Sequence, residues 1–381
     1  HDDSMGWQQA HVRSDGIHMW KAAKNAVLFS TECLFYGRCM GKQRVRRTTA
    51  YDIAYELGIA QSTVSRALNG NSNVSPAMRQ RVLLAAKELN YSINQAAARL
   101  RTQSTKTLAL VVLHRPDEGP TAINPFYFSL LGCVAASAAA RGYGLLVSFQ
   151  DIGGQLYGSY EDSSQADGLI VIGSSQNVDA WQHFKGLADE GYSVVFWGSP
   201  YETETAVRAD NHAGGALAAR HLLDQGCERI AFIGQTGDGP QQFTARYAGF
   251  ATELSKAGRE PILAEMPDGT DKEIQGAEAV ARLIDADVGF DGIFAATDLF
   301  AIGALQKLQE LHIDVPGNVA VVGFDGIRAG LYAYPTLTTI EQDLVKAGEQ
   351  LVDNVIAAIQ DRKGDGQPVP VNLQIRGSSR R

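Results

Sequence analysis

A short stretch of polar side chains could read a nucleic acid. A helix is predicted over residues 61–68, and its outer face would carry Gln61, Ser62, Ser65 and Arg66. These groups hydrogen-bond base edges or phosphates; arginine favours guanine and glutamine favours adenine. Thr63 and Val64 suit packing and backbone contact better. The pattern predicts contact with DNA bases, and a helical hairpin in an ordinary bundle is the structural alternative.

A second group of residues follows predicted strands and suits the binding of a small molecule. Aromatic faces with a few carboxylates suit a sugar or similar polyol, and such pockets are largely pre-formed. Several of these residues have a structural alternative: Asp325 and Asn124 could cap helices, and Trp197 could belong to the core. The candidates are Asn124, Phe126, Phe128, Trp197, Thr297, Asp298 and Asp325.

Short helices must hold the DNA-facing side chains. Thr49-Ala-Tyr-Asp52 resembles a capping box that opens a helix, with Asp in place of the usual Glu or Gln. Gly58 ends this helix in a tight turn, and Ser75-Pro76 starts a third helix because proline is favoured in a first turn. Two short helices joined by a tight turn place the second across a major groove.

Alternating strands and helices must hold the second group. The residues from Thr107 onward number about 275, which is enough for two lobes built on parallel sheets with helices on both faces. Ligands bind such doubly wound sheets at the carboxyl ends of the strands. The predicted strands are Leu108–Leu113, Gly144–Phe149, Gly168–Ile172, Ser193–Trp197, Arg229–Ile233, Gly292–Ala296 and Val319–Phe324.

Charge and composition narrow the class of protein. Residues 42–106 hold eleven Lys and Arg against three Asp and Glu, whereas the whole chain has a net charge of −8. A basic block on an acidic body predicts a polyanionic partner for that segment. No apolar run reaches the roughly 18–20 residues of a membrane helix. The four cysteines show no metal-ligand spacing, so we expect a cytoplasmic protein without metal, cofactor or disulfide framework.

The first of these segments resembles a known family. The motif D-I-A-x-x-L-G-I-A-x-S-T-V-S-R-A-L-N-G, then V-S-P-x-x-R-x-x-V and A-A-x-E-L-N-Y, is similar to the headpiece of the lactose-repressor (LacI/GalR) family. In that family the first residues of the recognition helix and its arginine read the operator; these positions fall on Gln61, Ser62 and Arg66. Ala60 stands where the family usually has a capping serine, which costs about 1 kcal/mol of helix stability.

The resemblance continues into a hinge. Residues 94–101 resemble the family segment that folds on the operator and wedges a leucine, here Leu100, into the minor groove, as apolar wedges do. An inert alanine-rich linker is the alternative. Ile93 replaces the usual proline before this segment. The full set of DNA-contacting residues that we predict is Thr49, Tyr51, Gln61, Ser62, Thr63, Ser65, Arg66, Asn69, Asn94, Ala97 and Leu100.

The later motifs resemble the family's effector-binding region. N-P-F-Y, D-G-L-I-V, D-N-x-x-G-G, R-I-A-F-I-G, R-Y-x-G-F, A-T-D-x-x-A-I-G-A, V-V-G-F-D-G and P-x-L-T-T-I occur in the family's order. The resemblance implies a two-lobed periplasmic-binding-protein-like fold in which Arg246 and Asp325 grip the ligand. A surface salt bridge is the alternative for Arg246. Asp210 and Asn211 are interpreted as a helix cap and left out of the site.

These observations predict four segments. Residues 1–47 form an extension that does not fit the pattern and is expected to be disordered, with Met40 as the natural start. A helix-turn-helix headpiece covers 48–93, a hinge helix 94–103 and the two-lobed effector domain 104–381. The expected function is a homodimeric transcription regulator, a repressor, that binds a palindromic operator under control of a small molecule such as a sugar. The sequence shows no recognisable catalytic motif that would indicate an enzyme, and a secreted solute-binding protein would have no headpiece.

Overall fold

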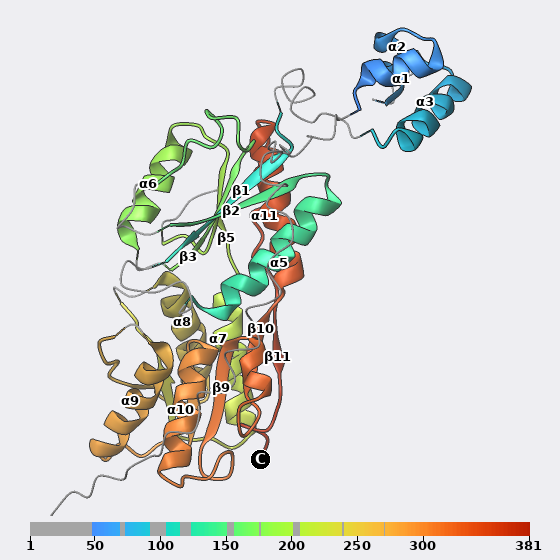
Figure 1. Ribbon diagram of the computed structural model, residues 1–381. Helices are drawn as coiled ribbons and strands as arrows, with labels where there is room; N and C mark the ends of the chain where they lie inside the picture. Colours follow the sequence, from blue (N-terminus) through green and yellow to red (C-terminus); the bar gives the residue numbers. More distant parts are fainter. Residues whose placement is uncertain are drawn as a thin grey trace, which may run out of the picture. The chain divides into compact units, whose positions relative to one another are not determined.

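The structure, a computed structural model, describes residues 48–68, 73–91, 104–114, 123–150, 156–174, 177–200, 206–237, 240–269 and 271–381 (Figure 1). The chain separates into two compact units, residues 1–94 and 95–381. In the described ranges no helix combines the length and apolar character that crossing a membrane requires. The expectations for residues 1–47, Asn69, Asn94, Ala97 and Leu100 concern positions outside the described residues.

The first unit contains three short helices in its described part: α1 (Ala50–Leu57), α2 (Gln61–Leu68) and α3 (Pro76–Glu88). The Asp52 carboxylate accepts a hydrogen bond from the backbone N–H of Thr49 at 2.7 Å, as the capping pattern predicts. Gly58 ends α1 with a φ of +64°, a left-handed conformation that glycine adopts without strain. The local signals therefore place these helices correctly.

A small hydrophobic core holds the three helices together. Ile53 of α1, Val64 of α2 and Val82 of α3 are completely buried in this core. Each comes from a different helix, so the three must pack to remove these side chains from water. Burial of Val64 and Ala67 turns the polar side of α2 outward.

The second unit contains two lobes, each with one sheet. The first-lobe sheet has the order β2-β1-β3-β4-β5 and is parallel throughout. Val111 of β1 pairs with Ser148 on one side and Val171 on the other. The strands are β1 (Thr107–Leu113), β2 (Gly144–Gln150), β3 (Leu169–Gly173), β4 (Val194–Trp197) and β5 (Ala206–Val207).

Helices cover both faces of this sheet, as the alternating pattern predicts. Leu108, Leu110 and Val112 of β1 pack against α5 (Pro125–Ala140) and α11 (Leu344–Ile359). The intervening residues of β1 point to the opposite face, where α6 (Val178–Asp189) packs. Because both faces are buried, the strand is apolar along its whole length.

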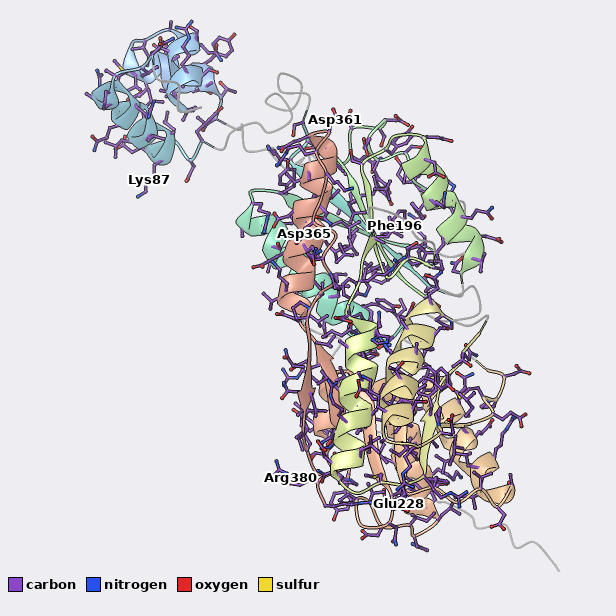
Figure 2. All side chains as sticks on the ribbon, turned by 180° about the vertical axis from the view of Figure 1, so that it is seen from behind. Lys87, Phe196, Glu228, Asp361, Asp365 and Arg380 are labelled. Carbon is purple, nitrogen blue, oxygen red and sulfur yellow. The ribbon has the colours of Figure 1, made fainter. Side chains whose placement is uncertain are left out.

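The second-lobe sheet repeats the strand order and adds an edge. Its order is β11-β10-β9-β8-β6-β7; the sheet is parallel, as predicted, except for the edge strand β11, which pairs antiparallel with β10. α9 and α10 cover one face (Figure 1), and α7 and α8 cover the other (Figure 2). The strands are β6 (Ile230–Ile233), β7 (Ile262–Leu263), β8 (Gly292–Ala295), β9 (Ala320–Asp325), β10 (Thr338–Gln342) and β11 (Val371–Gln374); the helices are α7 (Asn211–Asp224), α8 (Gln241–Lys256), α9 (Lys272–Asp285) and α10 (Asp298–Glu310).

The chain passes between the lobes more than once. It leaves the first lobe after β5, returns after β10 to place α11 against α5, and goes back to form β11. Four strands, β5, β7, β10 and β11, were not predicted. Two of them have only two residues, and the other two lie beyond the last predicted strand, so their pairing depends on distant segments of the chain.

A buried histidine ties α7 to the last described segment. His221 Nε2 lies 2.7 Å from the hydroxyl of Ser379, which donates to the hydroxyl of Thr338 at 2.7 Å. Burial lowers the pKa of His221 below its ordinary value of 6.5, and the nearby Asp224 carboxylate opposes this shift. The folded protein therefore favours the neutral imidazole.

We expect this histidine to make the protein less stable in mild acid. Below pH 6.5 the unfolded chain binds a proton that folded His221 resists, so the free energy of unfolding falls as pH falls, by at most about 1.4 kcal/mol per pH unit. Urea unfolding between about pH 5 and 7.5 should show a flatter dependence in His221→Gln. His212→Gln, a change of an exposed histidine on the same helix, should keep the wild-type slope.

Candidate functional site

The first unit presents a polar face on α1 and α2. Tyr51 is 72% exposed, and Thr49, Ser62 and Arg66 are also exposed. Gln61, Thr63 and Ser65 are half-buried. The predicted DNA-facing residues in the described part of this unit thus all lie at its surface, because the apolar positions of α2 turn inward.

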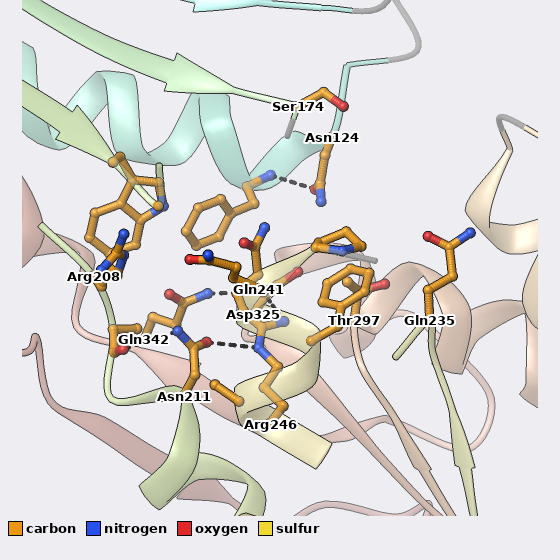
Figure 3. Close-up of a pocket in the computed structure, with 18 of the residues that line it drawn as sticks. Asn124, Ser174, Arg208, Asn211, Gln235, Gln241, Arg246, Thr297, Asp325 and Gln342 are labelled. Atoms are coloured by element: carbon orange, nitrogen blue, oxygen red, sulfur yellow. Dashed lines mark hydrogen bonds and ion pairs between the residues drawn. The ribbon is translucent and has the colours of Figure 1, made fainter. Parts of the chain in front are cut away.

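The second unit contains a cavity of about 220 Å³ at the carboxyl ends of its parallel strands (Figure 3). The first lobe contributes Asn124, Phe126, Trp197 and Arg208 to its lining. In each sheet the strand order reverses between the first and third strands of that lobe, β1 and β3 or β6 and β8, and such switch points are where doubly wound sheets bind ligands.

A buried ion pair lies at the second-lobe side of this cavity. Arg246 Nη1 lies 3.3 Å from Asp325 Oδ1, and the two side chains are only 5% and 6% exposed. Arg246 also donates to the carbonyl of Ala296 and, through Nε, to Asn211 Oδ1 at 2.9 Å. Gln342 Nε2 donates to the same Asp325 oxygen at 2.9 Å, as Figure 3 shows. The pair is therefore held by three further partners in fixed positions.

Burial and charge act in opposite directions on this pair. Burial lowers the pKa of Arg246 and raises the pKa of Asp325, while each partner's charge opposes the shift of the other. Among the described residues, Arg246 Nη2 and Asp325 Oδ2 have no hydrogen-bond partner. A polar molecule in the cavity could therefore satisfy one donor and one acceptor that are already in place.

The conformation of Asp325 is unusual for a residue with a side chain. Its φ is +115°, and Gly326 follows with a φ of +74°. Such a backbone costs about 1–3 kcal/mol and persists where the surrounding structure holds it, typically at binding sites. Here Asp325 ends a completely buried strand whose Phe324 ring lies 3.5 Å from the Arg246 guanidinium carbon.

The structure brings most of the predicted ligand-binding residues together. Asn124, Phe126, Trp197, Arg246, Thr297 and Asp325 all line the cavity. Asn124 and Thr297 also cap helices, since they accept hydrogen bonds from the backbone N–H groups of Phe126 and Phe300. Trp197 is 6% exposed and belongs to the first-lobe core as well. Asp325 ends a strand and caps no helix.

Two predicted residues lie elsewhere, which corrects the expectation for them. Phe128 is 45% exposed and packs against Phe149 of β2, because two residues along α5 turn it to the side opposite buried Phe126. Asp298 is completely buried outside the cavity lining. Its carboxylate accepts from the hydroxyl of Thr339 at 2.6 Å and the backbone N–H of Ile327 at 2.8 Å.

Asn211 is the main residue that sequence reasoning missed. Asp210 caps α7 by accepting from the backbone N–H of Ala213 at 2.9 Å, as predicted. Its neighbour Asn211 does not share that role and bonds Arg246 inside the cavity lining. Gln342 was missed because it ends β10, a strand that was not predicted. The position of a polar residue at a strand end was the signal that could have found it.

The polar face of α1 and α2 and the cavity lining of the second unit together indicate a DNA-binding regulator with a ligand-binding unit. A helix-turn-helix unit precedes a two-lobed unit whose cavity lies at strand ends. Residues 49–94 match the family described as bacterial regulatory proteins, lacI family, and residues 219–379 match the periplasmic binding protein-like domain.

Relatives agree with this class over most of the chain. The HTH-type transcriptional regulator CelR of Thermobifida fusca is 32% identical over 318 residues, which cover 81% of this chain and 91% of that protein. The HTH-type transcriptional repressor PurR of Mannheimia succiniciproducens is 28% identical, with 86% of this chain and 96% of that protein covered. The chain belongs to the LacI family and is a DNA-binding transcription regulator. This overturns the solute-binding alternative.

Solved structures share the fold. A structure described as a transcriptional regulator CelR–cellobiose complex has a TM-score of 0.60 and 27% identity, and the match covers 87% of this chain and 100% of that chain. A lac repressor dimer bound to operator has a TM-score of 0.67 at 24% identity, covering 88% and 99%. At that identity the second likeness supports the fold alone.

Proposed function

We propose that this regulator is a repressor that binds a palindromic operator and dissociates from it when a carbohydrate binds in the cavity. The observation that carries the proposal is the buried Arg246–Asp325 pair, which offers one donor and one acceptor to a cavity that Trp197 also lines. Paired donors and acceptors near an aromatic face suit the hydroxyls and apolar faces of a sugar. Two similar proteins are described with sugars: CelR with cellobiose, and a LacI-family regulator from Enterococcus faecium with ribose.

The neutral amides of the lining support a polyhydroxylated ligand. Gln235, Gln241 and Gln242 line the cavity together with Asn211 and Gln342. An amide offers both donors and an acceptor, so it can bond a hydroxyl in either sense. With one carboxylate, the cationic side chains of Arg208, Arg246 and Lys272 and several amides, the lining matches a molecule with many hydroxyls better than an apolar one.

We infer that the active form is a homodimer in the cytoplasm. Val147 and Phe149 on the edge strand β2 are 40% and 44% exposed, and Phe128 of the adjacent α5 is 45% exposed. Phe128 and Phe149 lie with ring centroids 6.2 Å apart, so they form one apolar surface. A second copy of the chain that covers this surface would supply the second headpiece that a palindromic operator requires.

Regulation follows from unequal binding to two lobe arrangements. A ligand that binds one arrangement more tightly shifts the population toward it, and the affinity for DNA changes by the same free energy, typically about 1–3 kcal/mol. The test begins with selection of an operator from random DNA by the purified chain. Addition of D-ribose, D-glucose or cellobiose should then release that operator, and a gel shift should show two chains on each palindrome. Turnover of a sugar without any DNA shift would overturn the proposal.

Arg66→Ala should weaken binding to the selected operator by about 1–3 kcal/mol, or roughly 5- to 150-fold in affinity. The reason is that Arg66 lies exposed on the outer face of α2, where its guanidinium can pair with a guanine. Binding to random DNA should change much less. Gel shifts at fixed salt measure both affinities.

The matched control for Arg66 is Arg81→Ala, which removes an equal charge from an exposed position on α3. It should alter operator and random-DNA binding alike. Equal losses on both DNAs for Arg66→Ala would reduce Arg66 to a phosphate contact and remove it from base recognition.

A further inference from the structure

The N-terminal end of α7 lies against Arg246. Asn211, the first residue of α7, accepts a hydrogen bond from Arg246 Nε at 2.9 Å (Figure 3). Phe324 lies beneath the guanidinium, whose carbon is 3.5 Å from the ring centroid. Two consecutive glycines of α7, Gly214 and Gly215, follow one turn after Asn211. Gly214 faces the ring of Phe324, and Gly215 faces the backbone of Arg246.

Gly215 lets α7 approach the backbone of Arg246. A Cβ atom at Gly215 would lie 1.9 Å from the carbonyl oxygen of Arg246 and 3.0 Å from the backbone nitrogen of Phe250. The contact is reciprocal, because a Cβ at Gly249 of α8 would lie 1.9 Å from the carbonyl oxygen of His212. Any larger residue at Gly215 must therefore push the two helices apart by roughly 1 Å.

Gly214 makes room for the ring that stacks on Arg246. A Cβ at this position would lie 2.5 Å from Phe324 Cε2 and 3.1 Å from Ile340 Cγ2. Phe324 is completely buried, so its ring has little space to move away. A side chain at Gly214 would consequently shift the ring relative to the guanidinium.

We propose that Gly214 and Gly215 are positioning residues for effector recognition: they set the backbone and the stacking ring of Arg246 so that its guanidinium meets Asp325 at the cavity. This inference rests on the proposed function of the cavity. α7 follows directly on the crossover between lobes, where Ala209 bridges Val369 and Asp210 caps the helix. α7 therefore connects that crossover to the Arg246 side chain through Asn211.

The test measures the position of Arg246 directly and does not depend on knowing the effector. In the full-length ¹⁵N-labelled protein, the Arg246 Nε–H signal is assigned by its loss in Arg246→Lys, and its hydrogen exchange rate is recorded. Gly215→Ala should raise this rate about tenfold because the bond to Asn211 is disturbed. Gly214→Ala, whose methyl group meets a ring instead of backbone atoms, is a milder change that should raise the rate in the same direction.

Gly348→Ala is the matched control. A Cβ there would lie 2.7 Å from the backbone carbon of Cys133, so it strains a helix contact of the same kind between α11 and α5. It should lower the melting temperature yet leave the Arg246 exchange rate at the wild-type value. An unchanged rate in both Gly214→Ala and Gly215→Ala would overturn the inference, because the glycines would then only pack helices.

Sugar binding forms the second arm of the experiment. Among D-ribose, D-glucose and cellobiose, any sugar that stabilises the wild-type protein against heat should bind roughly tenfold more weakly to Gly215→Ala, since a gripping group displaced by about 1 Å loses much of its effect. Gly348→Ala should bind it normally. If none of these sugars binds the wild-type protein, the carbohydrate proposal fails while the exchange rates still decide the role of the glycines.

Discussion

Asp325→Ala is expected to abolish the release of operator DNA by the effector and to destabilise the second unit by about 3–5 kcal/mol, because truncation leaves the Arg246 charge buried without its partner. The ion pair is only 5–6% exposed, so the Arg246 charge is poorly solvated once the carboxylate is lost. Arg246 would keep Asn211 and the carbonyl of Ala296, which are neutral acceptors. Operator binding without effector should stay near the wild-type value.

Two measurements check this expectation. Chemical unfolding gives the change in stability, and gel shifts with and without the effector sugar give the response. Asp353→Ala is the control, because Asp353 also pairs with an arginine, Arg141 at 2.5 Å, but its side chain is 57% exposed. Such a surface pair contributes about 0–1 kcal/mol. A full effector response in Asp325→Ala would show that the cavity has been assigned the wrong role.

Ile53→Ala should abolish operator binding while leaving the second unit folded and able to bind its effector. Ile53 is completely buried in the small core of the first unit, and truncation of a buried isoleucine costs about 2–5 kcal/mol. Domains of this size are marginally stable, so the loss is a large share of the total. With the core opened, α2 no longer presents its polar face in a fixed orientation.

Calorimetry and gel shifts separate the two units in this experiment. The melting transition of the second unit and its shift with the effector sugar should match those of the wild-type protein. Leu84→Ala serves as the control, since Leu84 lies on α3 but is 54% exposed and its truncation should cost little. Normal operator binding by Ile53→Ala would contradict the assignment of these three helices as the DNA-binding unit.

The sequence alone determined the class of fold and the polar outer side of α2. Capping signals at Thr49 and Ser75, the glycine turn and the apolar positions of α2 act within a few residues, so each can be recognised from the local sequence alone. Burial of Val64 then settles which side chains of α2 face outward, and Gln61, Ser62, Ser65 and Arg66 lie at that surface as predicted. The seven predicted strands were all found: six are buried on both faces and therefore apolar along their length, whereas β2 is an edge strand that is only partly buried.

Only the tertiary structure decided which polar residues meet in the cavity. Arg246, Asp325, Asn211 and Gln342 are separated by up to 131 positions in the sequence, and their contacts depend on how α7, α8 and two strands pack. Asp298 lies just after β8, and Asp325 ends β9. The Asp298 carboxylate nevertheless turns toward Thr339 and away from the cavity lining. A side chain's type and its place on an element are local properties. Its partner is set by packing between elements distant in the chain, which no local pattern encodes.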